Sequence, residues 1–115
     1  MKNDPASSDI TPRQSRSNVV PLKGEIDLHV SPTVTGTLND VIDKKPERLV
    51  VDLSEVSYID SSGIAALVEG FQSARARGSR FALVAVSDAV RAVLELARLD
   101  RVFLIVPDAA AVSGD

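Results

Sequence analysis

The sequence predicts one α/β domain, in which about four to five strands form a mixed central sheet and three to four helices pack on it. Short runs rich in β-branched residues alternate along the chain with segments whose apolar residues recur at helical spacing. The connections are short, which is typical of β-α-β units joined by right-handed crossovers around a largely parallel centre. The chain has 115 residues, of which 44% are hydrophobic, and this suffices for one compact core.

The polar residues 1–17 are expected to form an N-terminal tail, which could add an edge strand around residues 8–14. Residues 18–115 are expected to form the domain itself. Its first clear strand takes in residues 19–22 and Ile26, and an internal proline favours a place at the edge of the sheet.

The next segment is predicted to be a helix with Ser31 as its N-cap and Pro32 at its first helical position. Its apolar residues share one face, because they recur at helical spacing: Val34, Leu38, Val41 and Ile42. Residues 44–46 end this helix. Residues 48–53 then form a run rich in β-branched residues, as expected for a strand covered on both faces.

Two more helices and two more strands follow. The second helix ends at basic residues before Gly78, and its apolar face carries Ile64, Leu67, Val68 and Phe71. Residues 81–86 form a buried strand, and residues 102–106 form the last one. Between them, Ser87 caps the third helix, whose inward residues are Val90, Val93, Leu94 and Ala97.

The composition argues against several classes of function. Aromatic residues make up only 3% of the chain and the net charge is −3, so direct nucleic-acid binding is not expected. No apolar run approaches the roughly 20 residues of a membrane span, and the N-terminus lacks the apolar core of a signal peptide, so a cytoplasmic protein is expected. With no cysteine and a single histidine, His29, neither a metal site nor another cofactor is expected.

Catalytic patterns are also missing from the sequence. It contains no P-loop or dinucleotide-binding glycine motif, and a serine–histidine–acid triad would depend on the solitary His29. A phospho-aspartate receiver site could use Asp52 and Ser87, but the acidic pair and the lysine that such a site needs are absent. Asp52 is therefore interpreted as a strand-end carboxylate that accepts backbone N–H bonds, and no catalytic residue is predicted.

The most informative feature is Asp60-Ser61-Ser62-Gly63, which lies between the central strand and the second helix. Asp and Ser are favoured N-cap residues, so this turn could serve only to start the helix. The N-terminus of a helix also favours anions, because its first N–H groups lack intrahelical partners and the dipole is positive there. A phosphoryl group on one of the hydroxyls would be well placed, and the residues alone leave both interpretations open.

The wider context resembles a known family. Three segments of the chain resemble the signature of bacterial STAS-domain anti-sigma factor antagonists, and the resemblance extends over about residues 19–106. In chain order, the segments are Gly24-Glu25-Ile26-Asp27, Val51-Asp52-Leu53-Ser54 and Asp60-Ser61-Ser62-Gly63-Ile64. The resemblance implies a single STAS domain and a partner switch. The unmodified protein would bind an anti-sigma factor that is also a serine kinase, and so free a sigma factor. Phosphorylation with ATP would end this binding, and a PP2C-type phosphatase would reset the switch.

The resemblance also implies residue roles. The serine directly after the aspartate is the family's phosphoacceptor, which corresponds to Ser61, although Ser62 stays an alternative. Gly63 would lack a Cβ so that the kinase can approach, and Asp27 could equally be a turn residue before a helix. The protein would perform no catalysis and would be a monomer or weak dimer. Partner contacts would come from five residues: Asp60, Ser62, Gly63, Gly24 and Asp27.

Two segments depart from the family pattern. The family's first strand is hydrophobic, whereas residues 7–16 are polar and include a proline, and residues 107–112 leave room for only a short final helix. An alternative function is a STAS adaptor, either a scaffold in a signalling complex or a subunit of a lipid-transport system. An enzyme or a nucleotide-binding protein is disfavoured, because no such site is predicted.

Overall fold

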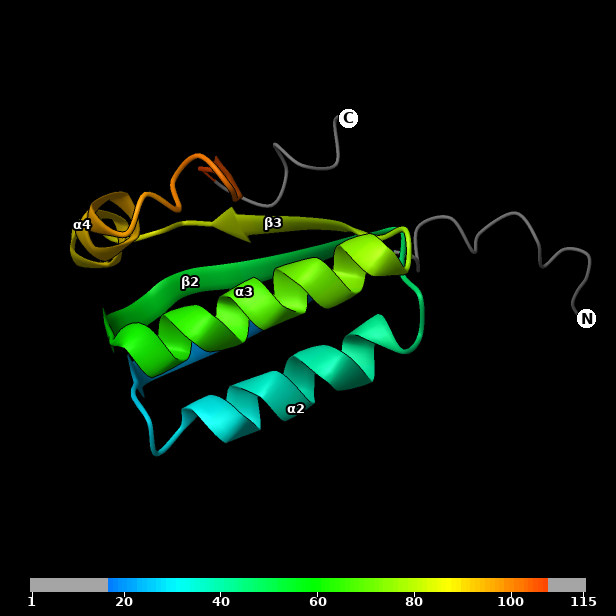
Figure 1. Cartoon of the computed structure of the whole chain (residues 1–115), viewed down its shortest axis with the longest axis horizontal. Helices are drawn as coiled ribbons and strands as arrows, with labels where there is room; N and C mark the ends of the chain where they lie inside the picture. The colour runs from blue at the N-terminus through cyan, green and yellow to red at the C-terminus, as the bar shows by residue number, and fades with distance from the viewer. Residues whose placement is uncertain (1–16, 108–115) are drawn as a thin grey trace, which may run out of the picture.

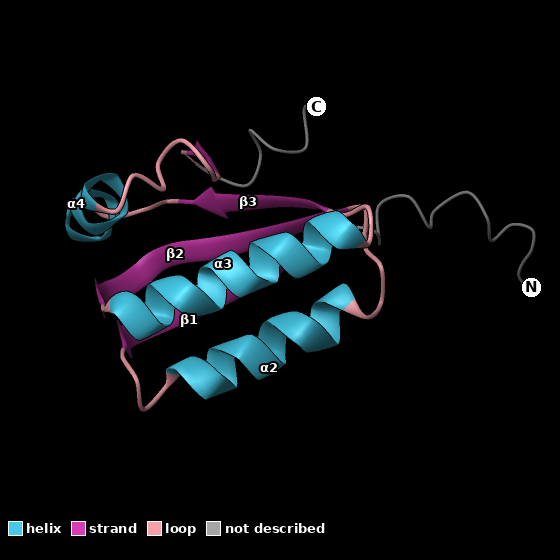
Figure 2. Cartoon of the chain, in the orientation of Figure 1, coloured by secondary structure: helices cyan, strands magenta, loops and turns pink. Residues whose placement is uncertain are grey.

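The computed structural model describes residues 17–107, so the edge strand considered for residues 8–14 and the segment after residue 107 lie outside the described part. Four strands form one sheet in the order β1-β2-β3-β4 (Figure 2). Every adjacent pair is parallel, which confirms the predicted parallel centre. Within residues 17–107 there is no antiparallel strand of the kind a mixed sheet requires. The strands are β1 (Ser17–Ile26), β2 (Arg48–Ile59), β3 (Arg80–Val84) and β4 (Leu104–Val106).

Three helices connect the strands: α2 (Ser31–Ile42), α3 (Ser61–Ala76) and α4 (Asp88–Leu96). When parallel strands follow the chain order and the crossovers are right-handed, the connecting helices lie on one face of the sheet. The main core cluster agrees, because it contains buried residues of all three helices together with Leu49 and Val51 of β2. Figure 1 shows α2 and α3 side by side, with α4 near the end of β3. The predicted α/β class is confirmed.

All three helices begin at the same edge of the sheet, because each follows the carboxyl end of a parallel strand. Asp60 is the N-cap of α3. Ser87 is the N-cap of α4, where its hydroxyl accepts the N–H of Val90 at 3.3 Å. The prediction that Ser87 caps the third helix is therefore confirmed.

The prediction that Ser31 is the N-cap of the first helix is wrong. Ser31 is the buried first residue of α2, and the N-cap is Val30, which makes no side-chain hydrogen bond to the helix. The backbone carbonyl of Asp27 instead accepts the N–H groups of Val30 at 3.1 Å and of Ser31 at 2.8 Å. The residue that follows β1 thus organises the start of α2.

Strand β2 continues to Ile59, whereas the sequence predicted its end at residue 53. The register between β1 and β2 shifts twice, and each shift gives β2 one extra residue, as in a β-bulge. Near the first shift, the Asp52 carboxylate accepts the N–H of Ser54 at 2.9 Å. The interpretation of Asp52 as a backbone-bonding carboxylate is confirmed, but Asp52 lies within the strand and not at its end.

Strand β4 begins at Leu104, later than predicted, because the N–H groups of Val102 and Phe103 both donate to the carbonyl of Leu99 in a turn. Phe103 is buried, and its ring meets that of Phe71 edge-on with 5.6 Å between the ring centroids. The C-terminal part of the predicted strand is confirmed, and its first two residues, the exposed Val102 and the buried Phe103, belong to the turn before it.

Candidate functional site

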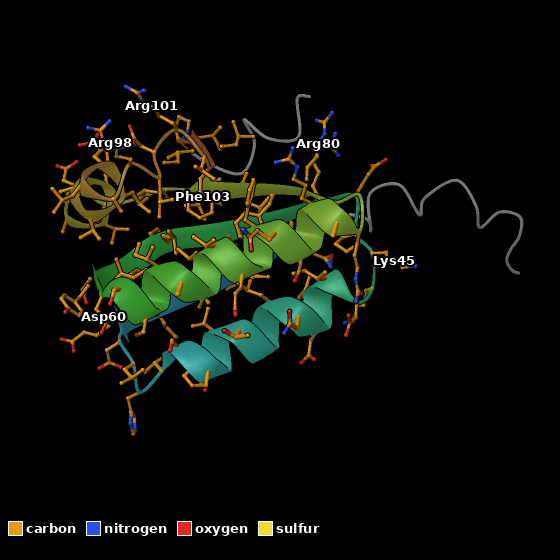
Figure 3. All side chains as sticks on the ribbon, in the orientation of Figure 1. Lys45, Asp60, Arg80, Arg98, Arg101 and Phe103 are labelled. Atoms are coloured by element: carbon orange, nitrogen blue, oxygen red, sulfur yellow. The ribbon has the colours of Figure 1, made fainter. Side chains whose placement is uncertain are left out.

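Two acidic turns lie side by side at the carboxyl ends of the strands, where the helices begin. Ile26 and Ile59 are register partners at the ends of β1 and β2, so Asp27 and Asp60, which follow them, are neighbours at this edge. The N–H of Asp60 also donates to the carbonyl of Ile26 at 3.2 Å, which joins the two turns. Figure 3 shows Asp60 at the N-terminal end of α3, on the opposite side of the molecule from Lys45.

Asp60 organises the first turn of α3. Its Oδ1 atom accepts the N–H groups of Ser62 (2.9 Å) and Gly63 (3.1 Å) and the hydroxyl of Ser62 (2.6 Å). The Ser62 hydroxyl is the largest cause that lowers the pKa of Asp60 below its ordinary value of 3.8. The N–H of Gly63 is the next cause, those of Ser62 and Leu28 contribute less, and desolvation opposes the shift. Asp60 is therefore negatively charged at neutral pH.

The hydroxyls of Ser61 and Ser62 differ in what can reach them. Ser61 is the first residue of α3 and is exposed, and its hydroxyl forms no hydrogen bond within residues 17–107. Ser62 is half-buried, and its hydroxyl donates to Asp60. The geometry therefore favours Ser61 as the hydroxyl that a modifying enzyme can reach.

The N-terminus of α3 offers an anion less support than the sequence indicated. The helix dipole favours negative charge there, but the N–H groups of Ser62 and Gly63 already donate to the Asp60 carboxylate. The next N–H, of Ile64, donates to the Asp60 carbonyl at 3.0 Å. A phosphoryl group on Ser61 would therefore meet a charged carboxylate at the same helix end.

The β1–α2 turn is held by Asp27, whose Oδ1 atom accepts the N–H groups of His29 at 3.0 Å and Val30 at 3.1 Å. Asp27 therefore acts as a turn residue, as considered from the sequence. It is half-buried, so part of the residue remains accessible to a partner. Gly24 is exposed and lies at the second register shift of β1, where its φ of +78° requires glycine for the backbone. Gly24 thus shapes the strand that leads into the turn.

Gly63 is buried, and the space that it keeps free lies inside the protein. A Cβ atom there would lie 2.6 Å from Cγ1 of Ile59 and 2.8 Å from the carbonyl oxygen of Ile26. The predicted reason for glycine, approach of a kinase from outside, is therefore replaced by close packing of α3 on the ends of β1 and β2. The sequence therefore predicted that Gly63 must be small, but the space that it leaves free faces the protein interior and not the partner.

A groove of about 400 Å³ runs between α2 and α3 beside this site, and no motif in the sequence predicted it. It begins next to Ser62, and the residues on its walls are mostly small. From α2 it is lined by Ser31, Pro32 and Thr35, and from α3 by Ser62, Ala65 and Glu69. The short side chains at these helix positions are the one sequence signal that could have indicated a gap.

Other kinds of site find no support in the described part of the chain. Within residues 17–107, no group of three or more His, Asp or Glu side chains is placed to hold a metal ion. His29 is exposed, and the contact that it makes in the turn is through its backbone N–H. None of the described helices is long and apolar enough to cross a membrane.

Comparison with known proteins agrees with this geometry. The family model described as "STAS domain" matches residues 10–111. The chain belongs to the STAS domain family. Over 82 residues it is 37% identical to the anti-sigma-B factor antagonist of Listeria monocytogenes, an alignment that covers 71% of this chain and 72% of that protein. The resemblance to anti-sigma factor antagonists is confirmed.

Solved structures are similar to the whole domain. The crystal structure of an anti-sigma factor antagonist from Mycobacterium paratuberculosis is 29% identical, with a TM-score of 0.76, and covers 83% of this chain and 80% of its own. A Thermotoga maritima protein, 24% identical, superposes with a TM-score of 0.80 over 86% of each chain. The second likeness supports the fold alone.

Proposed function

We propose that this protein is an anti-sigma factor antagonist that is switched by phosphorylation of Ser61. The observation that carries the proposal is the exposed Ser61 hydroxyl on the first residue of α3, next to a Ser62 hydroxyl that is tied to Asp60. The 37% identity to the Listeria monocytogenes antagonist supports an anti-sigma factor as the partner. In its unmodified form the protein binds this partner and thereby frees a sigma factor.

The switch follows from charge. Phosphorylation adds about −1.5 to −2 charges at pH 7. The Asp60 carboxylate is already charged at the same helix end, and Asp27 lies on the neighbouring turn. A partner surface fitted to neutral Ser61 would face this charge without compensation, and such a loss costs about 2–5 kcal/mol, or about 30-fold and more in affinity.

The protein supplies the acceptor hydroxyl and the binding surface, and it performs no catalysis itself. The anti-sigma factor acts as a serine kinase and transfers the phosphoryl group from ATP to Ser61 in the cytoplasm. A PP2C-type phosphatase removes this group by hydrolysis and restores binding. Asp60, Ser62 and Asp27 shape the contact surface, whereas the buried Gly63 and the strand residue Gly24 act through the backbone.

The test combines kinase assays with binding measurements. Each candidate anti-sigma factor of the source genome is incubated with ATP and the parent protein, Ser61→Ala or Ser62→Ala, and the intact mass is measured. We expect the parent and Ser62→Ala to gain one phosphoryl group and Ser61→Ala to gain none. Ser61→Asp should bind the anti-sigma factor at least about 30-fold more weakly than the parent.

Two results would refute the proposal. If phosphorylation persists in Ser61→Ala and disappears in Ser62→Ala, the phosphorylated residue is Ser62 and the proposed role of Ser61 is wrong. Parent-like affinity of Ser61→Asp for every anti-sigma factor would remove the switch, and constitutive association with a scaffold or transport complex would then favour the adaptor function.

A further inference from the structure

Leu28 is a large apolar side chain held in water beside the proposed phosphorylation site. It is 74% exposed. Its loop is fixed by the Asp27 carboxylate, which accepts the N–H groups of the two residues after Leu28, and by the hydroxyl of Ser31, which donates to the Leu28 carbonyl at 3.5 Å. The Leu28 N–H also faces the Asp60 carboxylate. Because the loop is ordered before binding, a contact through Leu28 loses little conformational freedom.

The groove between α2 and α3 opens at the same place. Ser61 and Ala65 are one turn apart and share a face of α3, and Ala65 lines the groove. Ser31, which lines the groove from α2, is also bonded to the Leu28 carbonyl. Leu28, Ser61 and the groove are therefore parts of one surface. The small side chains on its walls let the backbone of a partner approach closely.

The charge of the groove indicates what fits it. Glu69 is exposed and is the one charged residue on its walls; no Lys or Arg of the described residues lines it. Glu69 follows Ser61 by eight residues, which is about 12 Å along α3. A basic side chain paired with Glu69 would therefore lie about two helical turns from Ser61, and its ion-pair partner would be Glu69. Such a side chain would complement the charge of the groove.

We infer that the α2–α3 groove, with Leu28 as an anchor at its open end, receives an apolar segment of the anti-sigma factor that carries a basic residue opposite Glu69. This inference rests on the proposed function and names the surface used by that partner. A phosphoryl group on Ser61 stands at the mouth of the groove and blocks the segment as it enters.

The first test truncates the anchor. Leu28→Ala is compared with Leu96→Ala, since Leu96 on α4 is 87% exposed and lies outside this surface. The dissociation constant of each unphosphorylated protein is measured by titration calorimetry against each candidate anti-sigma factor of the source genome. We expect Leu28→Ala to bind about tenfold more weakly than the parent and Leu96→Ala to stay within about twofold.

The second test fills the groove. Ala65→Arg adds bulk and positive charge on its wall, and Ala76→Arg adds the same side chain at an exposed position near the far end of α3. Ala65→Arg should weaken binding at least about tenfold, and Ala76→Arg should leave it within about twofold. Thermal unfolding of all four variants verifies that each is folded.

The outcomes separate the inference from the proposed function. If the parent binds and Ser61→Asp does not, the proposed function stands, and parent-like binding by either Leu28→Ala or Ala65→Arg overturns the inference. If the parent binds none of the anti-sigma factors, the proposed function fails and the inference fails with it.

Discussion

Replacing Gly63 by alanine tests how tightly α3 is held against the strand ends. The added Cβ would lie 2.6 Å from Cγ1 of Ile59, 2.8 Å from the carbonyl oxygen of Ile26 and 2.9 Å from Cγ2 of Ile26. That carbonyl cannot turn away freely, because it accepts the N–H of Asp60. The first turn of α3 must therefore move outward, and overpacking of this kind costs about 1–3 kcal/mol.

Gly36 provides a matched control. It lies in α2, is exposed, and has nothing within 4 Å of the place of its Cβ. Gly36→Ala should stabilise the protein by about 0.5–1 kcal/mol, because alanine has the higher helix propensity. Gly63 lies in the first turn of α3, where this gain is no larger than in the interior of α2, so Gly63→Ala should be less stable than Gly36→Ala by at least the packing cost of about 1–3 kcal/mol.

The assay is urea unfolding followed by circular dichroism at pH 7, with thermal scans alongside it. The packing cost corresponds to about 4 °C in Tm per kcal/mol for a domain of this size. Gly63→Ala should therefore unfold well below Gly36→Ala in both temperature and urea. If Gly63→Ala is as stable as Gly36→Ala or more so, the first turn of α3 is not packed as described.

Two further predictions concern helix caps. The pKa of Asp60 is lowered in the folded protein, so its charge stabilises the fold above pH 3.8, and this contribution is lost as the pH falls from 3.8 through the lower pKa of the folded state. Asp60→Asn keeps a cap acceptor but does not titrate, so the advantage of the parent in urea unfolding should be constant from pH 7 to about 5 and vanish in acid; identical pH profiles would contradict this. Ser87→Ala removes the bond to Val90 and should cost about 1 kcal/mol in urea unfolding, whereas Ser87→Asn should retain most of it; equal stability of the two variants would contradict the cap.

The features that the sequence predicted well are those coded by neighbouring residues. The apolar face of α3 follows from helical spacing, and its buried residues include Ile64 and Leu67 as expected. The cap at Ser87 is likewise local. The length of β2 is not, because its second half contains exposed Ser54 and Ser57, a composition that is typical of a loop. Pairing with β1 as far as Ile26 keeps that segment extended, and this partner is distant in the sequence.

The residues of the site also differ in how far the sequence alone predicts their roles. Asp60 was recognisable as a cap, but the choice between Ser61 and Ser62 depends on which way each side chain points. Consecutive residues of a helix are about 100° apart, so the two serines have different surroundings: Ser62 is half-buried and lines the groove, whereas Ser61 is exposed. Which one lines the groove is set by where α2 and the strand ends lie. Tertiary packing therefore determines which of the two serines is accessible for the proposed phosphorylation.

The rigidity of this helix end determines how the proposed switch can act. The first turn of α3 is fixed by the Asp60 carboxylate, by the bond from its N–H to Ile26 and by the close packing of Gly63. To reach the N–H groups of Ser62 and Gly63, a phosphate on Ser61 would have to displace Asp60, and Asp60 also faces the loop that carries Leu28. The phosphate therefore stays on the outer side of an intact frame. Its free-energy cost then falls on the interface with the partner and not on the fold, which is what a reversible release of that partner requires.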